Sequence, residues 1–430
     1  MIIREYSKVE LVFSSSESEA VKIALVNLRR DLIRTLDCSV TAGGIIRILV
    51  GTVGNLPELD EKADISKLRA EDGTYRKEAF LIQEKDGELL IAGTDRRGTI
   101  YGIYDFCEWL GVSPWYFFAD VPVRRRSEAV IENGYCKVDY PSVEYRGIFI
   151  NDEEELEHWV WRYMGETTIG VKTYEKIFEL LLRLKLNYIW PAMHVNSFNL
   201  KQENGALANR MGIVVGTSHC DMLMRSNNRE WKPWLAKKGY TDVEYDFSIP
   251  GRNREILKEY WRESVEQNRD FEVSYTVGMR GIHDSGFETK SLEGLTGEKL
   301  LKAKIELLES VMAAQQEILS ETLDTEPMKT FVPYKEVLEL YDNGLKVPED
   351  LTLIWTNDNY GYVRRYPGEK EKARKSGNGI YYHNSYWAPP GASYLFICSI
   401  PMSHTRNELL KAYKEGIQKV WVTNFGAIKH

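Results

Sequence analysis

The strongest constraint on the fold is a regular alternation of short apolar segments with amphipathic helical segments after residue 145. The predicted strands are RGIFIN (146–151), NYIWPAM (187–193), GIVVGTSH (212–219), EVSYTVGM (272–279), KTFVPY (329–334), LTLIWTN (351–357), GIYYHNSYW (379–387) and KVWVTNF (419–425). Helices are expected at 173–186 and 298–323. This order predicts a (β/α)8 barrel. An open doubly wound sheet is the alternative, but its glycine-rich phosphate loop does not follow the first strand.

The residues before the barrel predict a separate, small α/β domain. Its expected elements are a helix at 19–36, a strand at 45–51, a hairpin at 79–94 and a helix at 98–111. The polar stretch VRRRSE leads to Pro141, so we expect domains at 1–140 and 141–430. The sequence stops shortly after the eighth strand, and the eighth barrel helix is therefore expected to be missing.

Composition and motifs limit the classes of partner and cofactor that the sequence predicts. The net charge is −8 without a basic tail, which argues against a nucleic-acid partner. No run of about 18 apolar residues predicts a membrane span. The first residues, MIIREYSKVE, do not resemble a signal peptide, so we expect a cytoplasmic protein, or an extracellular one if the N-terminus is clipped. The sequence contains no CxxC, GxGxxG, Walker A or HExxH motif, and no cofactor is expected.

Polar side chains follow almost every predicted barrel strand, at the end where barrels carry their reacting groups. In chain order they are Asn151 and Asp152, Trp190 and His194, Ser218, His219 and Asp221, Arg280, His283 and Asp284, Tyr334, Lys335 and Glu336, Asn357, Asp358 and Asn359, and Tyr382, His383, Tyr386 and Trp387. Because no histidine pair has HxH or HxxxH spacing, we expect no metal site.

Two of these acids, Asp284 and Glu336, follow neighbouring strands. A carboxyl pair across a site is what glycoside hydrolysis requires, one group protonating the leaving oxygen and the other attacking or activating water. Structural roles are the alternative, with Asp284 capping a turn and Glu336 opening a helix.

At these residues the chain resembles glycoside hydrolase family 115, the xylan α-1,2-glucuronidases. The motifs that carry the resemblance are TDRRGTIYGIYDF, GVSPWYFFADVP, YRGIFINDEE, NYIWPAMH, GTSH, VPYKEV, NDNYGYVRR, GIYYHNSYW and KVWVTNFG. It implies a barrel behind a small α/β domain. It also implies removal of glucuronic or 4-O-methylglucuronic acid side chains from glucuronoxylan or its oligosaccharides, with inversion and without a metal.

The resemblance also implies roles for individual residues. Glu336 resembles the general acid, Asp284 its carboxylate partner and first candidate for the base, and Asp152 the next candidate. The expected substrate-binding residues are Arg280, His219, Trp190, Asn359, Asp358, His383 and Tyr386. An arginine fork suits a uronate carboxylate, and Arg280 lies four residues before Asp284, where it would help to keep a base ionised.

Three positions depart from the family pattern. Cys220-Asp221 stands where the family has Glu-Pro, Asn357 replaces an aspartate, and Gly426-Ala427 replaces Gly-Asp. The family's C-terminal regions are also absent from this sequence. An inverting α-glucuronidase is the leading hypothesis. The alternatives are a non-catalytic barrel that binds acidic glycans and a hydrolase of another uronate linkage. The sequence leaves open sugar methylation, polymer preference and oligomeric state.

Overall fold

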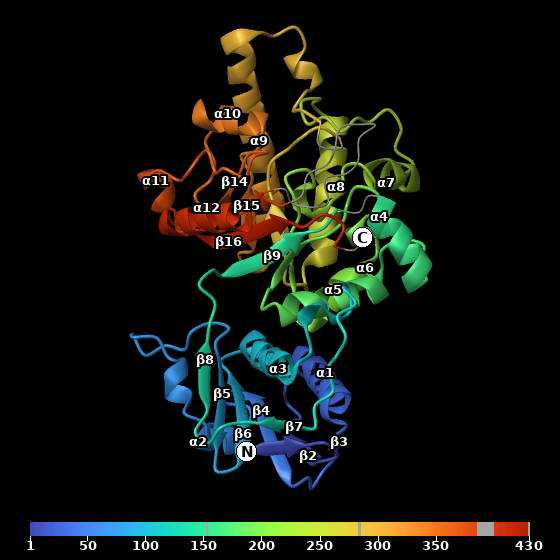
Figure 1. Cartoon of the computed structure of the whole chain (residues 1–430). Helices are drawn as coiled ribbons and strands as arrows, with labels where there is room; N and C mark the ends of the chain where they lie inside the picture. The colour runs from blue at the N-terminus through green and yellow to red at the C-terminus, as the bar shows by residue number, and fades with distance from the viewer. Residues whose placement is uncertain (152–153, 283–284, 385–399, 429–430) are drawn as a thin grey trace. The chain divides into compact units, whose positions relative to one another are not determined.

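The structure is a computed structural model that describes residues 1–151, 154–282, 285–384 and 400–428 (Figure 1). Contacts between Cα atoms divide the chain into two compact units. The first contains Met1–Ser142, Glu175–Asn187 and Arg210–Gly212, and the second contains Val143–Tyr174, Tyr188–Asn209 and Ile213–His430. In the described part of the chain, no helix has the length and apolar character needed to cross a membrane.

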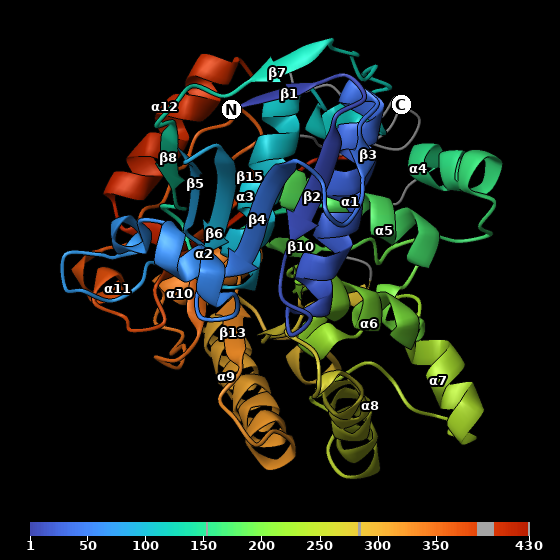
Figure 2. The ribbon, with the colours of Figure 1, turned by 90° about the horizontal axis from the view of Figure 1, so that it is seen from below.

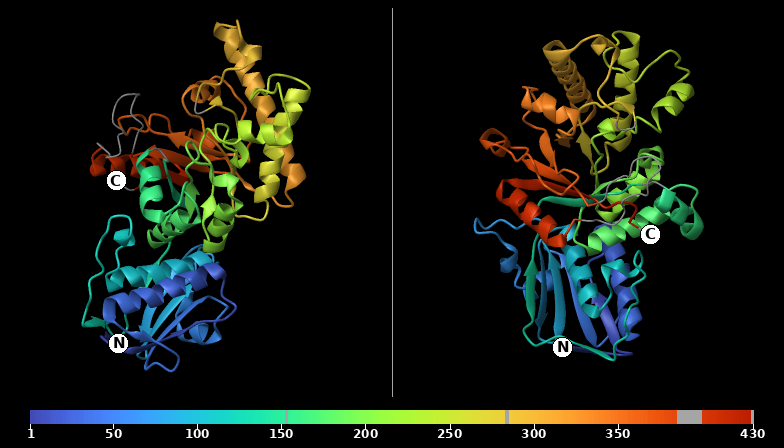
Figure 3. Two further views of the ribbon diagram at one scale, coloured as in Figure 1. Left: turned by 90° about the vertical axis from the view of Figure 1, so that its right-hand side faces the viewer. Right: turned by 45° about the horizontal axis from the view of Figure 1, so that its top comes forward.

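The first unit is a layered α/β domain. Its elements are β1 (Ile2–Arg4), β2 (Lys8–Val12), α1 (Glu19–Leu36), β3 (Ser39–Val40), β4 (Ile46–Thr52), α2 (Pro57–Lys62), η1 (Ile65–Leu68), β5 (Phe80–Lys85), β6 (Glu88–Gly93), α3 (Arg96–Leu110), η2 (Pro114–Tyr116), β7 (Glu128–Val130) and β8 (Cys136–Asp139). Six strands form one sheet in the order β3-β2-β4-β6-β5-β8, which can be followed across Figure 2. Helices α1 and α3 lie side by side along one face of this sheet (Figure 3).

Helix α3 shows how the sequence builds this unit. Asp95 begins the helix, because its side chain accepts hydrogen bonds from the backbone N–H groups of Arg97 and Gly98. Gly111 ends it in a left-handed conformation. Gly102 lets the helix approach the sheet closely, since a Cβ atom there would lie 2.8 Å from a methyl carbon of Ile91.

The second unit contains the barrel. Its elements are β9 (Tyr145–Phe149), α4 (Glu154–Trp159), the π-helix η3 (Val160–Met164), α5 (Val171–Arg183), β10 (Tyr188–Trp190), η4 (Phe198–Leu200), α6 (Gln202–Met211), β11 (Val214–Val215), η5 (Met222–Met224), α7 (Trp231–Lys238), α8 (Arg252–Asn268), β12 (Ser274–Thr276), η7 (Lys290–Leu292), α9 (Gly297–Thr322), β13 (Met328–Phe331), α10 (Glu336–Asp342), β14 (Thr352–Thr356), α11 (Glu369–Lys372), β15 (Asn378–His383), α12 (Met402–Lys414) and β16 (Ile417–Asn424). Helix α5 crosses the boundary between the two units, because Glu175 and the residues after it cluster with the first.

The barrel strands form one parallel sheet in the order β11-β10-β9-β16-β15-β14-β13-β12. An isolated parallel bridge between Val215 and Val273 joins the two outer strands, so the predicted (β/α)8 barrel is confirmed. Within the described residues, no helix follows β16. Helices α8 and α9 lie beside each other on the outside of the sheet (Figures 1 and 2).

Large side chains fill the barrel interior. The buried cluster contains Phe149, Tyr188, Trp190, Val214, Val332, Ile354, Tyr381, Val420 and Val422. Filling by large side chains from successive strands is typical of this architecture. Position 147 in β9 requires glycine for a steric reason, because a Cβ atom on Gly147 would come within 1.9 Å of the Tyr188 carbonyl oxygen.

Candidate active site

The polar residues of the candidate site follow barrel strands at their C-terminal ends. His219 follows β11, Arg280 follows β12, Glu336 follows β13 and His383 is the last residue of β15. Because the strands are parallel, these ends meet at one end of the barrel. The topology therefore brings together residues that are up to 164 positions apart in the sequence.

Arg280 and Glu336 form the central ion pair. Nη2 of Arg280 donates to Oε2 of Glu336 over 3.2 Å, and the backbone N–H of Phe287 donates to Oε1 over 3.2 Å. The Arg280 side chain is 3% exposed, whereas that of Glu336 is 25% exposed. Glu336 is thus held from two sides and is still reachable from solvent.

A sharp turn places Glu336 at the start of α10. The backbone N–H of Val337 donates to the carbonyl of Tyr334 over 3.1 Å, which closes a four-residue turn. Lys335 has φ 50° and ψ −124°. This is the first central position of a type II′ turn, where glycine dominates. Such strain at a non-glycine residue costs roughly 1–3 kcal/mol, and it clusters at functional sites.

Tyr334 is the common neighbour of Arg280 and two histidines. Its ring centroid lies 4.4 Å from that of His219 and 5.8 Å from that of His383, stacked on the latter. The guanidinium carbon of Arg280 lies 5.7 Å from the same ring. An aromatic face attracts a nearby cation, so the ring helps to hold Arg280 in place.

Asn357 fixes the orientation of His383. Its Oδ1 accepts from the backbone N–H of His383 over 2.8 Å and lies 2.9 Å from the ring Nδ1. Because an amide oxygen only accepts, Nδ1 carries the proton. In the neutral form of the ring, Nε2 is then the acceptor. The asparagine that departs from the family pattern therefore has a defined structural role.

Asp358 and Asn359, both predicted to bind substrate, lie in the turn after β14. Oδ1 of Asp358 accepts from the backbone N–H groups of Tyr360 and Tyr362, and its Oδ2 accepts from Nε of Arg364 over 2.6 Å. Burial would raise the pKa of Asp358, but the backbone donors and Arg364 lower it below its ordinary value. Asp358 stabilises this turn, whereas Asn359 is exposed.

Trp190, predicted to contact the substrate, is fully buried. Its ring packs against Phe149 and Tyr381, and its Nε1 donates to the hydroxyl of Tyr188 over 3.0 Å. Trp190 thus supports the aromatic residues of the barrel interior, with no surface open to a ligand.

Several predicted site residues fall outside the described part of the chain. They are the acids Asp152 and Asp284, and Tyr386. Of the predicted set, the structure brings together Glu336, Arg280, His219 and His383. Among the side chains it describes, no group of three His, Cys, Asp or Glu lies close enough together to hold a metal ion.

Sequence reasoning missed two aromatic contacts of the site. Tyr334 was only one of several polar residues at strand ends, yet it contacts Arg280 and both histidines. Tyr381 was not singled out, although its ring centroid is 4.1 Å from that of His383. Strand alternation contained this signal, because Tyr381 and His383 are two residues apart and share a face. Tyr382 faces the other way, and its hydroxyl donates to the carbonyl of Gly361.

The barrel and the polar cluster at its strand ends are typical of (β/α)8 barrel enzymes, which carry their active sites at this end. The model of glycosyl hydrolase family 115 matches residues 138–430. The chain therefore belongs to glycosyl hydrolase family 115.

A solved structure of a family GH115 4-O-methyl-α-glucuronidase, BtGH115A, described as specific for decorated arabinogalactans, is similar to the whole chain. The TM-score is 0.88 at 35% sequence identity, over 100% of this chain and 55% of that one. The chain thus spans about half the length of this relative.

Two more distant structures share the fold. A GH138 enzyme targeting pectin rhamnogalacturonan II matches with TM-score 0.54 at 13% identity, over 97% of this chain and 46% of that one. CpGH84D matches with TM-score 0.53 at 12% identity, over 99% and 64%. A search of curated proteins finds no match to this sequence.

Proposed function

We propose that this protein is an α-glucuronidase that removes glucuronic or 4-O-methylglucuronic acid side chains from a glycan with inversion. The observation that carries the proposal is the buried Arg280 guanidinium paired with the partly exposed Glu336 carboxylate. Family membership and the similarity to a 4-O-methyl-α-glucuronidase support it.

Arg280 would recognise the carboxylate of the uronic acid. A planar guanidinium matches a carboxylate in geometry and charge, and burial strengthens the contact because water does not compete for it. A guanidinium has five N–H donors, and one of them, on Nη2, now pairs with Oε2 of Glu336. A substrate carboxylate bound at that donor would release Glu336 from its present ion pair.

Released from Arg280, Glu336 would take up a proton from solvent, act as the general acid and protonate the glycosidic oxygen as the bond breaks. Asp284 would be the general base that activates water on the opposite face of the sugar, with Asp152 as the next candidate. His383 offers Nε2 as a hydrogen-bond acceptor for a sugar hydroxyl, because Asn357 holds the proton on Nδ1.

The glycan that carries the side chain is part of the proposal. Glucuronoxylan and its oligosaccharides are the substrates that the family resemblance implies, while the similar BtGH115A is described as specific for decorated arabinogalactans. A terminal uronate on either glycan would be the group that Arg280 binds. We therefore include both in the test.

The test is a proton NMR time course of the protein with glucuronidated xylo-oligosaccharides and with glucuronidated arabinogalactan oligosaccharides. The β-anomer of the free uronic acid should appear first, before mutarotation. Initial release of the α-anomer would refute inversion. Broadened oligosaccharide signals without any release would identify a barrel that binds acidic glycans and does not cleave them.

A further inference from the structure

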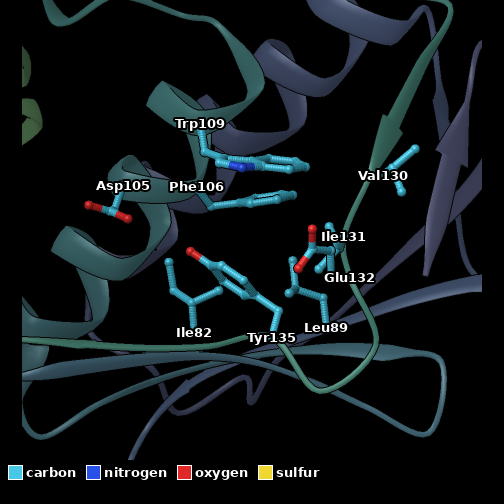
Figure 4. Close-up of a pocket in the computed structure, with 9 residues that line it drawn as sticks. All are labelled: Ile82, Leu89, Asp105, Phe106, Trp109, Val130, Ile131, Glu132 and Tyr135. Carbon is cyan, nitrogen blue, oxygen red and sulfur yellow. The ribbon is translucent and has the colours of Figure 1, made fainter.

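A second pocket lies within the first unit, between α3, the β5–β6 hairpin and the segment after β7 (Figure 4). Its volume is about 240 Å³. The lining residues are Ile82, Leu89, Asp105, Phe106, Trp109, Val130, Ile131, Glu132 and Tyr135. The pocket is smaller than the sites of drug-sized ligands, so it suits a small molecule or one ring of a larger one.

Aromatic side chains form much of the wall. The rings of Phe106 and Trp109 stack with centroids 5.6 Å apart and an interplanar angle of 15°. Figure 4 shows this pair on one side of the pocket and Tyr135 on another. Phe106 is buried, while Trp109 and Tyr135 are half-buried and reachable. Aromatic rings of this kind combine a large apolar surface with polar edges.

The rim of the pocket is held in place by a tight turn. The backbone N–H of Tyr135 donates to the carbonyl of Glu132 over 3.1 Å, and Gly134 has φ 74°. The buried carboxylate of Glu84 accepts from the backbone N–H of Gly134 over 2.7 Å. The turn therefore fixes the backbone from which the side chains of Glu132 and Tyr135 extend.

Of the two carboxylates that line the pocket, Asp105 is paired with lysines and Glu132 can bind a ligand. Asp105 is neutralised by Nζ of Lys137 over 2.7 Å and by Nζ of Lys185 over 2.6 Å. Glu132 is exposed, and it forms no ion pair with any residue that the structure describes. Within the same part of the chain, the hydroxyl of Tyr135 makes no hydrogen bond.

We propose that this pocket binds one neutral sugar ring of a glycan chain. The apolar face of a sugar ring matches the aromatic wall, and two neighbouring hydroxyls match the two oxygens of Glu132, with Tyr135 as a further partner. The carboxylate of Glu132 repels an anion, so a uronate is not the occupant. The inference goes beyond the proposed function, because it places a separate glycan contact in the other unit.

The experiment is a calorimetric titration of the protein with neutral xylo-oligosaccharides and galacto-oligosaccharides that carry no uronate. We expect a dissociation constant on the order of 1 mM. Glu132→Ala and Trp109→Ala should each weaken binding about tenfold or more, and Tyr135→Phe, which keeps the packing, about fivefold. Asn133→Ala, in the same turn but outside the pocket lining, is the control and should bind like the wild type.

Hydrolysis of a small aryl glucuronide separates this site from the proposed catalytic one. All four variants should cleave it at the wild-type rate, which shows that the barrel site is intact in each of them. If the wild type releases no uronate from glucuronidated oligosaccharides in the NMR time course but binds neutral oligosaccharides through Glu132, the pocket assignment holds and the proposed function fails. The sugar assignment would be overturned if the wild type did not bind the neutral oligosaccharides, or if binding survived in both alanine variants. It would also be overturned if the pocket preferred an aromatic cation, phenethylammonium, or an anion, glucuronate, to neutral sugars.

Discussion

Asn357 holds His383 by its backbone and its ring at once, since one amide oxygen lies 2.8 Å from the backbone nitrogen and 2.9 Å from Nδ1. Both contacts need only an acceptor at this position. The aspartate that the family pattern favours would provide the same acceptor, so the replacement conserves the orientation of the imidazole.

Asn357→Ala should therefore lower kcat/KM about tenfold, because His383 loses the group that fixes its ring. Asn357→Asp should stay close to the wild type. Steady-state kinetics on a glucuronidated oligosaccharide measure both variants, and the nitrogen chemical shifts of the His383 ring report its tautomer. Equal losses in the two variants would contradict this role.

Arg280→Gln should raise KM for a glucuronidated oligosaccharide by roughly 10- to 100-fold, because a charged hydrogen bond to the substrate carboxylate is lost. The matched substrate is the same oligosaccharide with its uronate reduced to the neutral sugar. The wild type should bind it poorly, and the substitution should change its binding little. A similar effect on both substrates would mean that Arg280 acts only through Glu336.

Glu336→Gln should lower kcat by about 10²–10⁴-fold while leaving substrate affinity largely unchanged, as expected for loss of a general acid. Glu339→Gln is the control, since Glu339 is exposed in the first turn of the same helix. Single-turnover kinetics and calorimetry separate chemistry from binding. Full activity of Glu336→Gln would remove this residue from the mechanism.

The backbone of Lys335 allows a direct measurement of strain. Lys335→Gly and Lys335→Ala both remove the side chain, but only glycine adopts φ 50° and ψ −124° without a steric cost. The glycine variant should be more stable than the alanine variant by about 1 kcal/mol in urea unfolding. Equal stabilities would show that the turn stores no strain at this residue.

The first unit contains a buried ion network. Glu179 accepts from Arg183 over 2.9 Å and from Arg30 over 2.7 Å, and Arg183 also pairs with Asp31 over 2.6 Å. Burial would raise the pKa of Glu179, but the two guanidinium groups lower it from 4.5 to about 2. Because the folded pKa lies below the unfolded one, this contribution to stability is present above about pH 4.5 and is lost as the pH falls toward 2.

Glu179→Gln should accordingly reduce the free energy of unfolding by about 3 kcal/mol at neutral pH, because it leaves the buried Arg183 and the partly buried Arg30 short of a partner. Between pH 4.5 and 2, the free energy of unfolding of the variant should also fall less than that of the wild type. Urea unfolding at several pH values measures both effects. Glu175→Gln, on the exposed side of the same helix, should change neither, and a neutral result for Glu179→Gln would contradict the network's role.

The sequence predicted the barrel because each strand is a short apolar run, and burial of such runs is encoded locally. The positions of Arg280, His219 and Glu336 followed from the rule that loops after parallel strands carry the site. The contacts around Tyr334 were not predictable in this way. They depend on which side chains of different strands point into the same space, and local patterns do not contain that information.

Two further differences have physical causes. Trp190 was predicted to contact a sugar, but its ring is fully buried and packs in the barrel interior. Asp358 was predicted to bind the substrate, and the structure shows another role for it, because its oxygens stabilise the turn that follows it. Aspartates in turns commonly accept from nearby backbone N–H groups, so this alternative was available from the sequence Asp-Asn-Tyr-Gly.

The closure of the barrel has a consequence for the motions of the site. One bridge, Val215 to Val273, joins β11 and β12, whereas β15 and β16 pair over six positions. The seam is therefore the place where the barrel wall should separate at the lowest free energy, and amide hydrogens there should exchange with solvent first. His219 and Arg280 follow the two strands on either side of this seam. A ligand held by both residues would join the two edges, so its binding should slow exchange at the seam more than elsewhere in the sheet.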